Sequence, residues 1–172
     1  MYLLDTNLIS ELRKAKSGKA DVNVIAWARS QSSSSLFVSA ISILEIEMGI
    51  LLKERTDPKQ AAILRTWLNT HVLTTFADRI LPIDTSVALK CAKLHIPNPK
   101  SERDALIAAT ALVHGMTVIT RNTKDLKPPT THLNRVVECG AKYVQTHWSG
   151  FNQSVASPLK CLRSHRMVGL RT

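Results

Sequence analysis

The chain has 172 residues, a formal net charge of +10 and three cysteines, and these figures exclude several classes of protein. No apolar run approaches the ~20 residues that span a bilayer, and the N-terminus lacks the features of a signal peptide. The cysteines include no Cys-x-x-Cys pair, which argues against a disulfide framework or a cysteine-zinc site. We therefore expect a soluble, reduced, cytoplasmic protein with no membrane partner.

The positive charge is concentrated near the C-terminus. Residues 1–126 contain 16 Lys and Arg against 12 Asp and Glu, a net charge of +4, whereas residues 127–172 contain 7 against 1, a net charge of +6. A basic chain favours polyanionic partners, nucleic acid first. Because most of the net positive charge follows residue 126, the pI of about 9.9 reflects the C-terminal segment more than the folded domain.

Short apolar strands alternate with helices through the first 126 residues. The opening run Met1-Tyr2-Leu3-Leu4 is too short for a helix and predicts a buried strand that ends at Asp5. Asn7 is expected to cap a short helix through about Leu12, and Asp21 a second helix through about Ser30. Further strands are predicted over residues 36–39, 80–83 and 116–120, and further helices over 42–51, 58–70, 85–95 and 101–114. This alternation predicts an α/β domain with a mostly parallel sheet.

The pattern changes after residue 127. Pro128-Pro129-Thr130-Thr131 interrupts it, Val136-Val137 is a candidate last strand, and no sustained period follows residue 150. We therefore predict one domain over residues 1–135 and an atypical basic extension over residues 136–172 that is partly disordered.

Acidic residues lie where the predicted strands end. Asp5 ends the first strand, and Glu45 lies in the first turn of the helix after the second strand, so both belong at the edge where α/β sheets place their ligand sites. Asn122 and Asp125 follow the fourth strand. Asp104 lies in the first turn of the helix before that strand, so the pattern alone does not bring it to this edge.

Carboxylates that converge at one edge repel one another, and burial raises their pKa values. A hard divalent cation resolves this conflict, because carboxylates, water and phosphate oxygens are the ligands of Mg²⁺, and Mn²⁺ accepts similar ones. Such an ion lowers the pKa of a bound water and stabilises charge on a phosphate under in-line attack. The acids therefore predict metal-dependent phosphate chemistry without a covalent nucleophile.

Each acid also has a purely structural interpretation. Ser42 and Glu45 have the spacing of a capping box, and Ser101 and Asp104 form a weaker version of it. Acidic residues in a first helical turn also interact favourably with the helix dipole. Asp5 has the weakest structural alternative, because acidic residues are depleted in strands.

Two further acids lie close to these in the sequence. Glu47 is two positions from Glu45, so it is expected to face away from it on the helix and to be solvated. Glu11 either reaches the edge of the site or is exposed.

Four stretches of the chain, in order and at suitable separations, resemble the PIN-domain ribonucleases of the VapC/FitB type, the toxins of bacterial toxin–antitoxin pairs. They are Leu3-Leu4-Asp5-Thr6-Asn7 with Ser10-Glu11, Ser39-Ala40-Ile41-Ser42-Ile43-Leu44-Glu45-Ile46-Glu47-Met48-Gly49, Arg103-Asp104-Ala105-Leu106-Ile107-Ala108-Ala109-Thr110-Ala111, and Thr120-Arg121-Asn122-Thr123-Lys124-Asp125. Together they cover about residues 1–126.

The resemblance implies a PIN-like α/β/α sandwich with a central, mostly parallel sheet of four or five strands. It implies RNA cleavage with Mg²⁺ or Mn²⁺, homodimerisation, and inhibition by a cognate antitoxin through which the pair contacts operator DNA. By the same resemblance Asp5, Glu45 and Asp104 are metal ligands. Thr6 and Thr120 would orient ligands, water or substrate through their hydroxyl groups.

The chain departs from the family pattern at its last motif. Asn122 stands where many relatives have aspartate, so it is a neutral oxygen ligand at best, and Asp125 is the alternative. Arg121 either meets a substrate phosphate or makes a structural ion pair. The loss of this acid keeps a second interpretation open, a PIN-fold module that binds RNA or protein with impaired catalysis.

Overall fold

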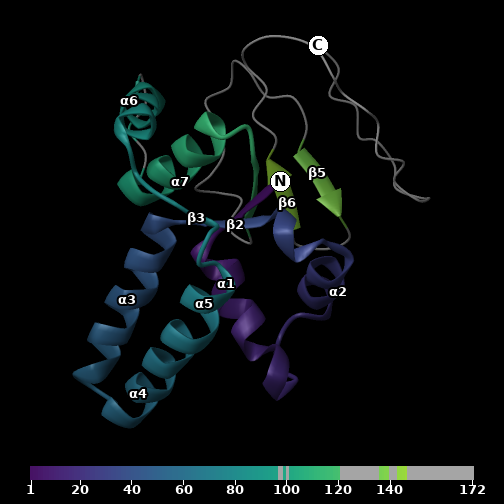
Figure 1. Ribbon diagram of the computed structural model, residues 1–172, viewed down its shortest axis with the longest axis vertical. Coiled ribbons are helices and arrows are strands. Elements are labelled where there is room, and N and C mark those ends of the chain that lie inside the picture. Colours follow the sequence, from purple (N-terminus) through teal and green to yellow (C-terminus); the bar gives the residue numbers. More distant parts are fainter. Residues whose placement is uncertain (97–98, 100, 121–135, 140–142, 147–172) are drawn as a thin grey trace.

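The structure is a computed structural model, and it describes residues 1–96, 99, 101–120, 136–139 and 143–146. Its sheet has the strand order β3-β2-β1-β4-β6-β5 (Figure 1). The strands are β1 (Tyr2–Leu4), β2 (Leu36–Ser39), β3 (Ile80–Leu81), β4 (Thr117–Thr120), β5 (Val136–Cys139) and β6 (Tyr143–Thr146). The first four are parallel, whereas β6 pairs antiparallel to β4 and to β5.

Helical segments connect the parallel strands. They are α1 (Thr6–Arg13), η1 (Lys14–Ser17), α2 (Val22–Ser30), η2 (Ser33–Ser35), α3 (Ala40–Glu54), α4 (Pro58–Trp67), η3 (Leu68–Val72), α5 (Leu73–Thr75), α6 (Thr85–Leu94) and α7 (Glu102–Val113). In the described part of the chain no helix is long and apolar enough to cross a membrane.

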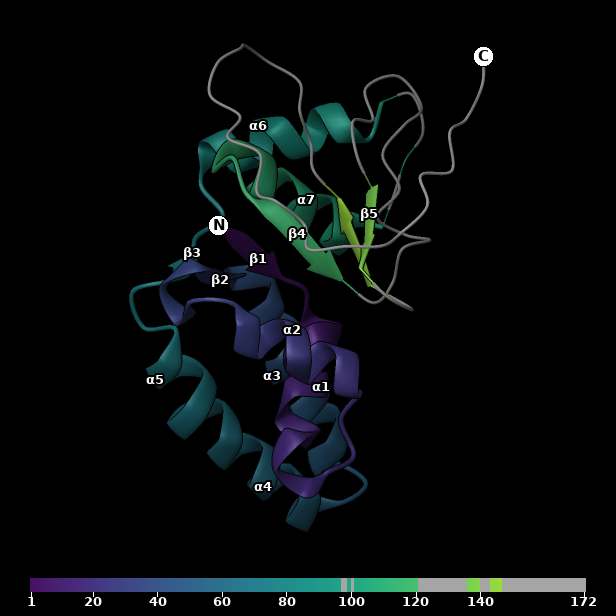
Figure 2. The ribbon, with the colours of Figure 1, turned by 90° about the vertical axis from the view of Figure 1, so that its right-hand side faces the viewer.

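Two hydrophobic cores lie on opposite faces of the sheet. Leu4 and Val38 pack with residues of α1 to α4, whereas their neighbours Leu3 and Phe37 pack with α7. This alternation follows from the strand geometry, because successive side chains point to opposite faces. Figure 2 shows the result, with α6 and α7 covering one face of the sheet and α1 to α5 the other. The predicted α/β/α sandwich is therefore confirmed.

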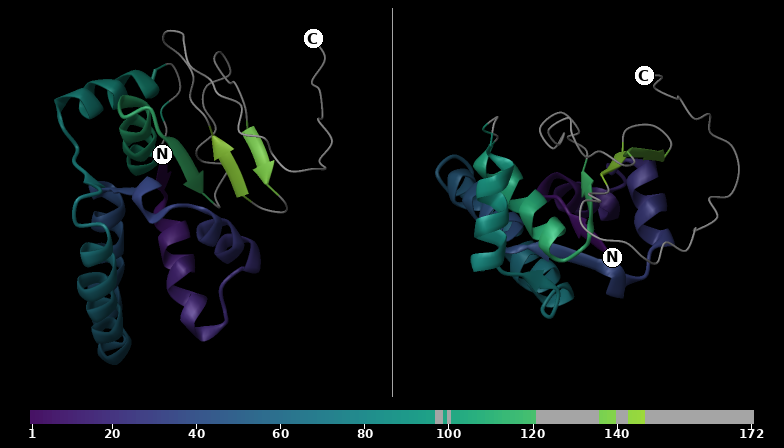
Figure 3. Two further views of the ribbon diagram at one scale, coloured as in Figure 1. Left: turned by 45° about the vertical axis from the view of Figure 1, so that its right-hand side comes forward. Right: turned by 90° about the horizontal axis from the view of Figure 1, so that it is seen from above.

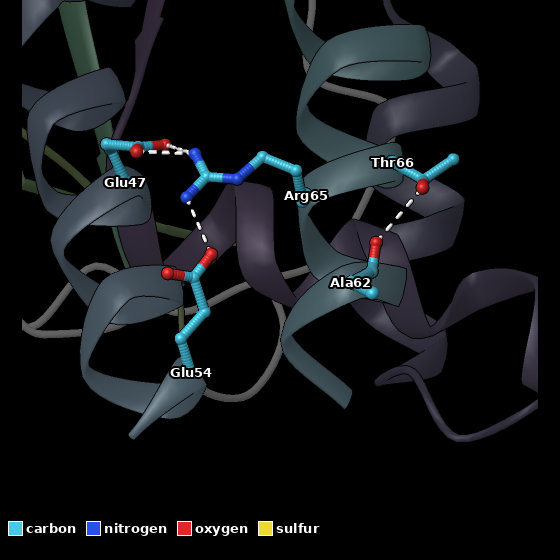
Figure 4. Close-up of polar contacts among 5 residues, drawn as sticks. All are labelled: Glu47, Glu54, Ala62, Arg65 and Thr66. Carbon is cyan, nitrogen blue, oxygen red and sulfur yellow. Dashed lines mark hydrogen bonds and ion pairs between the residues drawn. The ribbon is translucent and has the colours of Figure 1, made fainter. Parts of the chain in front are cut away.

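Helices α3 and α4 lie side by side and extend away from the sheet as a helical arm (Figures 1 and 3). Arg65 of α4 connects the two helices, because its Nη1 donates to both carboxylate oxygens of Glu47 and its Nη2 donates to Oε1 of Glu54 at 2.9 Å (Figure 4). Glu47 faces away from the site, and its side chain is 35% exposed and pairs with Arg65.

Several element boundaries differ from those predicted. Helix α1 begins at Thr6 with Asp5 as its N-cap, so Asn7 lies inside the helix instead of capping it. Helix α3 begins at Ala40, two residues before the predicted Ser42. The helix predicted over 58–70 ends at Trp67, where the π-helical turn η3 begins.

The sheet also extends further than predicted. It has six strands where four or five were expected, since β6 was not recognised, whereas β5 contains the predicted Val136-Val137. Strand β3 lies at an edge of the sheet, followed at once by Pro82. The division of the chain at residue 135 stays a prediction, and residues 147–172 lie outside the described residues.

Candidate acidic site at the carboxyl edge of the sheet

Asp5 lies at the carboxyl end of the central strand β1, and its side chain is 4% exposed. Its backbone N–H donates to the carbonyl oxygen of Ile119 at 3.0 Å, which continues the pairing with β4. One carboxylate oxygen, Oδ1, accepts from the Thr6 N–H at 2.7 Å and so caps α1. The other, Oδ2, accepts from the Thr120 hydroxyl at 2.7 Å. The end of the strand and the start of the helix therefore fix this carboxyl group.

The electrostatic environment of Asp5 disfavours its charged form. Burial raises the pKa of the Asp5 carboxyl above its ordinary value of 3.8, and the negative charges of Glu45 and Asp104 raise it further. The hydrogen bonds from Thr120 and Thr6 act in the opposite direction but do not cancel the effect of burial. Because both other acids act on Asp5, the fold brings all three carboxylates to one edge of the sheet, including the one that the sequence pattern did not place.

Glu45 lies in the second turn of α3, with its side chain 22% exposed. Its Oε2 accepts from the Thr6 hydroxyl at 2.5 Å, and its Oε1 lies 3.7 Å from Nη1 of Arg103. Thr6 therefore contacts both acids, since its N–H bonds to Asp5 and its hydroxyl bonds to Glu45.

The capping-box interpretation of Glu45 is wrong, because Ser42 does not begin the helix. The N-cap of α3 is Ser39, whose Oγ accepts from the Ile41 N–H at 3.2 Å. Ser42 is fully buried, and its hydroxyl lies 3.5 Å from the carbonyl oxygen of Leu4, to which it donates. Helix capping therefore gives no reason for an acid at position 45.

Asp104 lies in the first turn of α7 and is partly buried. The N-cap of α7 is Ser101, but the Ser101 side chain makes no capping hydrogen bond, so the serine half of the predicted capping box is not formed. Helix α7 reaches the edge because Ile107 packs in the same core cluster as Leu3 of β1 and Ile41 of α3. That cluster packs α3 and α7 against the central strand β1.

The remaining predicted positions divide into two groups. Thr120 is fully buried and, like Thr6, donates its hydroxyl to one of the acids. Arg121, Asn122 and Asp125 lie outside the described residues, so their predicted roles stay predictions.

Two further charged residues were left undecided or without a role by the sequence. Glu11 is 5% exposed, so the second of its two alternatives, exposure, is wrong. It accepts from the Asp21 N–H at 3.0 Å and from Lys14 Nζ at 2.9 Å, and so ties the loop after α1 to the helix. Arg103 was given no role of its own, yet it pairs with Glu45. Its position next to Asp104 in the sequence was the only available signal.

The donor set at this edge fits a hard divalent cation. It consists of the carboxylates Asp5, Glu45 and Asp104, and oxygen donors of this kind are the ligands of Mg²⁺ and Mn²⁺. Their charges act on one another in a partly buried place, and a cation would relieve that repulsion. In the described part of the chain, however, no group of three or more acidic, histidine or cysteine residues is already arranged to hold a metal ion.

The comparisons with known proteins agree with this fold. Residues 2–127 match the family described as the PIN domain, and the chain belongs to that family.

Within that family the chain is similar to bacterial toxins. It is 38% identical over 128 residues to the VapC ribonuclease Y4jK of Sinorhizobium fredii, with 72% of this chain and 88% of the relative covered. It is 36% identical over 129 residues to Toxin FitB of Neisseria gonorrhoeae, with the same coverage of both chains. A crystal structure of FitAcB from Neisseria gonorrhoeae matches with a TM-score of 0.65 and 34% identity, covering 73% of this chain and 91% of that one.

Proposed function

We propose that this protein is a divalent-metal-dependent endoribonuclease that hydrolyses phosphodiester bonds in RNA and serves as the toxin of a toxin–antitoxin pair. The observation that carries the proposal is the buried carboxyl group of Asp5, whose pKa is raised by burial and by the charges of Glu45 and Asp104. Perturbed pKa values cluster at functional sites. The similarity to proteins described as a VapC ribonuclease and as Toxin FitB supports RNA as the substrate.

The proposed ligands are Asp5, Glu45 and Asp104, with Mg²⁺ or Mn²⁺ as the ion. A bound ion of this kind supplies an acidified water as nucleophile and stabilises the charge that develops on the phosphate. Thr120 holds one oxygen of Asp5, and Thr6 connects Asp5 to Glu45, so the two threonines fix the orientation of the acids. Asn122 or Asp125 would complete the set of oxygen groups.

The proposed partners follow from the relatives. One solved relative is described as FitAB bound to a DNA fragment, at 34% identity and a TM-score of 0.64. By analogy this chain would form a homodimer, bind a cognate antitoxin and contact operator DNA only through that antitoxin. Action in the cytoplasm is part of the same proposal. Co-expression with the product of the adjacent upstream gene, followed by co-purification, tests the antitoxin partner.

Metal-dependent cleavage of a structured RNA tests the enzymatic proposal. The wild-type protein should cleave in Mg²⁺ or Mn²⁺ but not in a chelator, and Asp5→Asn should lose more than about 100-fold in rate. Asp84→Asn is a matched control, since Asp84 caps α6 at an exposed position. Equal cleavage by the wild type and Asp5→Asn would overturn the proposal, and so would undiminished cleavage in the chelator.

A second candidate function is a PIN-fold module that binds RNA without cleaving it. Asn122 favours it, because this residue stands where many relatives have aspartate. In this case the wild type and Asp5→Asn would bind RNA equally and neither would cleave it. Binding that weakens steeply with salt would then identify phosphate contacts as its source.

A further inference from the structure

Arg103 is the cation that approaches the acidic site within the described ion pairs. Its side chain is 50% exposed, and its Nη1 lies 3.7 Å from Oε1 of Glu45. A direct hydrogen bond between an arginine and a carboxylate is closer to about 2.8 Å. The pair is therefore loose, and its guanidinium faces solvent on one side.

A loose, exposed ion pair contributes little stability and is easily exchanged for another partner. Glu45 does not depend on this pair for its position, because its other oxygen, Oε2, accepts from the Thr6 hydroxyl at 2.5 Å. Arg103 can thus leave without releasing Glu45. Arginine also keeps its charge at every working pH, and its planar fork matches two oxygens of a phosphate group.

The position of Arg103 in the first turn of α7 also favours contact with a phosphate group. The N-terminal end of a helix carries a partial positive charge that favours anions. Ser101, the N-cap residue, makes no capping hydrogen bond with its side chain. An RNA phosphate beside Arg103 would therefore meet both the guanidinium and the positive end of α7.

We propose that Arg103 is a substrate-binding residue that exchanges partners. Without metal it partly neutralises Glu45; when a divalent cation is held by the acids, Arg103 turns to a phosphate of the RNA backbone. This inference rests on the proposed nuclease function. It gives Arg103 two opposite effects, since it competes with the metal for Glu45 and attracts the substrate.

Two binding measurements test this exchange. The first is Mn²⁺ affinity without RNA, followed by electron paramagnetic resonance, for the wild type, Arg103→Ala, Arg103→Lys and Arg55→Ala. Arg103→Ala should bind Mn²⁺ more tightly, by up to about fivefold, because the competing charge is gone. Arg55→Ala should match the wild type, since Arg55 lies ten residues beyond Glu45 on α3, about 15 Å along the helix.

The second measurement is the affinity for a short single-stranded RNA in the presence of Ca²⁺, which takes the same kind of oxygen ligands as Mg²⁺ and keeps the acids occupied. Arg103→Ala should weaken binding about threefold to tenfold and reduce the slope of log affinity against log salt by about 0.7, the contribution of one phosphate contact. Arg103→Lys should retain most of the affinity, because it retains the charge. Arg55→Ala should change neither the affinity nor the slope.

Tighter Mn²⁺ binding together with weaker RNA binding supports the exchange. Unchanged or weaker Mn²⁺ binding by Arg103→Ala overturns it, and so does unchanged RNA binding. If the wild type binds Mn²⁺ and cleaves RNA while Arg103→Ala behaves like it in both assays, the Arg103 proposal fails and the proposed function stands. If the wild type neither binds Mn²⁺ nor cleaves RNA, both fail.

Discussion

Glu45 and Glu47 lie two residues apart on α3, and their carboxylates have opposite surroundings. In the helical arm, Glu47 shares Arg65 with Glu54, and the arginine donates directly to both acids. At the edge of the sheet, Glu45 lies near two more acids, and Arg103 approaches it only to 3.7 Å. In the arm one arginine donates hydrogen bonds to both acids, whereas at the edge the charges of Glu45 and Asp104 raise the pKa of Asp5.

This difference separates a structural ion pair from a group of residues that is poised to bind a ligand. Arg65 shows that this protein can pair neighbouring acids closely when the purpose is to hold two helices together. At the edge, burial raises the pKa of Asp5 instead of a close cation lowering it. A site that is to bind a divalent cation must keep its carboxylates available, and that requirement carries a cost in the metal-free protein.

The largest effect is expected from removing the charge of Glu45, with Glu47 on the other side of α3 as the control. Glu45→Gln keeps the size of the side chain and an acceptor for Thr6 but removes a proposed metal ligand, so RNA cleavage should fall by more than about 100-fold. Glu47→Gln should leave cleavage within about twofold of the wild type, because Glu47 contacts Arg65 and not the site. Initial rates at saturating Mg²⁺ measure both. Equal loss in the two variants would mean that α3 acts only through its packing.

A smaller loss is expected from removing a hydroxyl group behind the acids. The hydrogen bond from the Thr120 hydroxyl to Oδ2 of Asp5 lowers the pKa of that carboxyl. Thr120→Val removes this bond, so the pKa of Asp5 should rise further and cleavage should fall by about 10- to 100-fold. Thr66→Val is the matched control in the arm, where the hydroxyl bonds only to the Ala62 carbonyl at 3.0 Å (Figure 4). Wild-type rates for Thr120→Val would remove the threonine from the proposed site.

The order of strands and helices followed from the sequence, because strand-length apolar runs alternate with helix-length amphipathic ones. Strong local signals gave accurate boundaries, as at Asp57-Pro58, where the Asp57 carboxylate accepts from the Gln60 N–H at 3.1 Å and α4 begins. Predictions that depended on pairing with distant segments were less accurate. Strand β6 was missed because its neighbour β4 in the sheet is far from it in the sequence.

Helix capping was predicted for the wrong acid. Glu45 has the spacing of a capping box, but α3 begins earlier, at Ala40 behind Ser39. Asp5 had the weakest structural explanation, yet it is the N-cap of α1. Both errors have one cause: α1 and α3 each follow a strand directly, so the residue that caps them is the one at which the chain leaves the sheet. The position of Asp104 depends on how α7 packs against β1, which local spacing does not encode.

Replacing Asp5, an acid that the proposed activity requires, is expected to stabilise the protein. Because the pKa of Asp5 is higher in the folded state, the fold favours the protonated carboxyl group. The protein therefore loses stability as the pH rises from 3.8, the ordinary pKa of this group, through the folded-state pKa. Asn cannot ionise, so Asp5→Asn should be more stable than the wild type at pH 7 in a chelator, by on the order of 1 kcal/mol. The gain should disappear near pH 4.

Urea unfolding at pH 4 and at pH 7 measures this difference. Asp84→Asn is again the control, because asparagine caps a helix about as well as aspartate, and its stability should stay within about 0.5 kcal/mol of the wild type. Mg²⁺ should raise the stability of the wild type and not that of Asp5→Asn, since only a folded protein with intact ligands gains from the ion. A destabilised Asp5→Asn at pH 7 would show that the hydrogen bonds from Thr6 and Thr120 to the charged carboxylate outweigh the cost of burying it.

The smallest effect is expected in the arm. Glu47 and Glu54 hold the Arg65 guanidinium and raise the pKa of its charged form, but the group is close to solvent, where ion pairs contribute little. Arg65→Gln should lower the melting temperature slightly at low salt and leave RNA cleavage unchanged. The difference from the wild type should shrink in 1 M salt, about a 3 Å Debye length, because screening weakens the attraction in the wild type and the repulsion between the two acids in the variant. A loss of cleavage in Arg65→Gln would mean that the arm and the edge are coupled through α3, and the contrast between Glu45 and Glu47 would no longer separate structure from function.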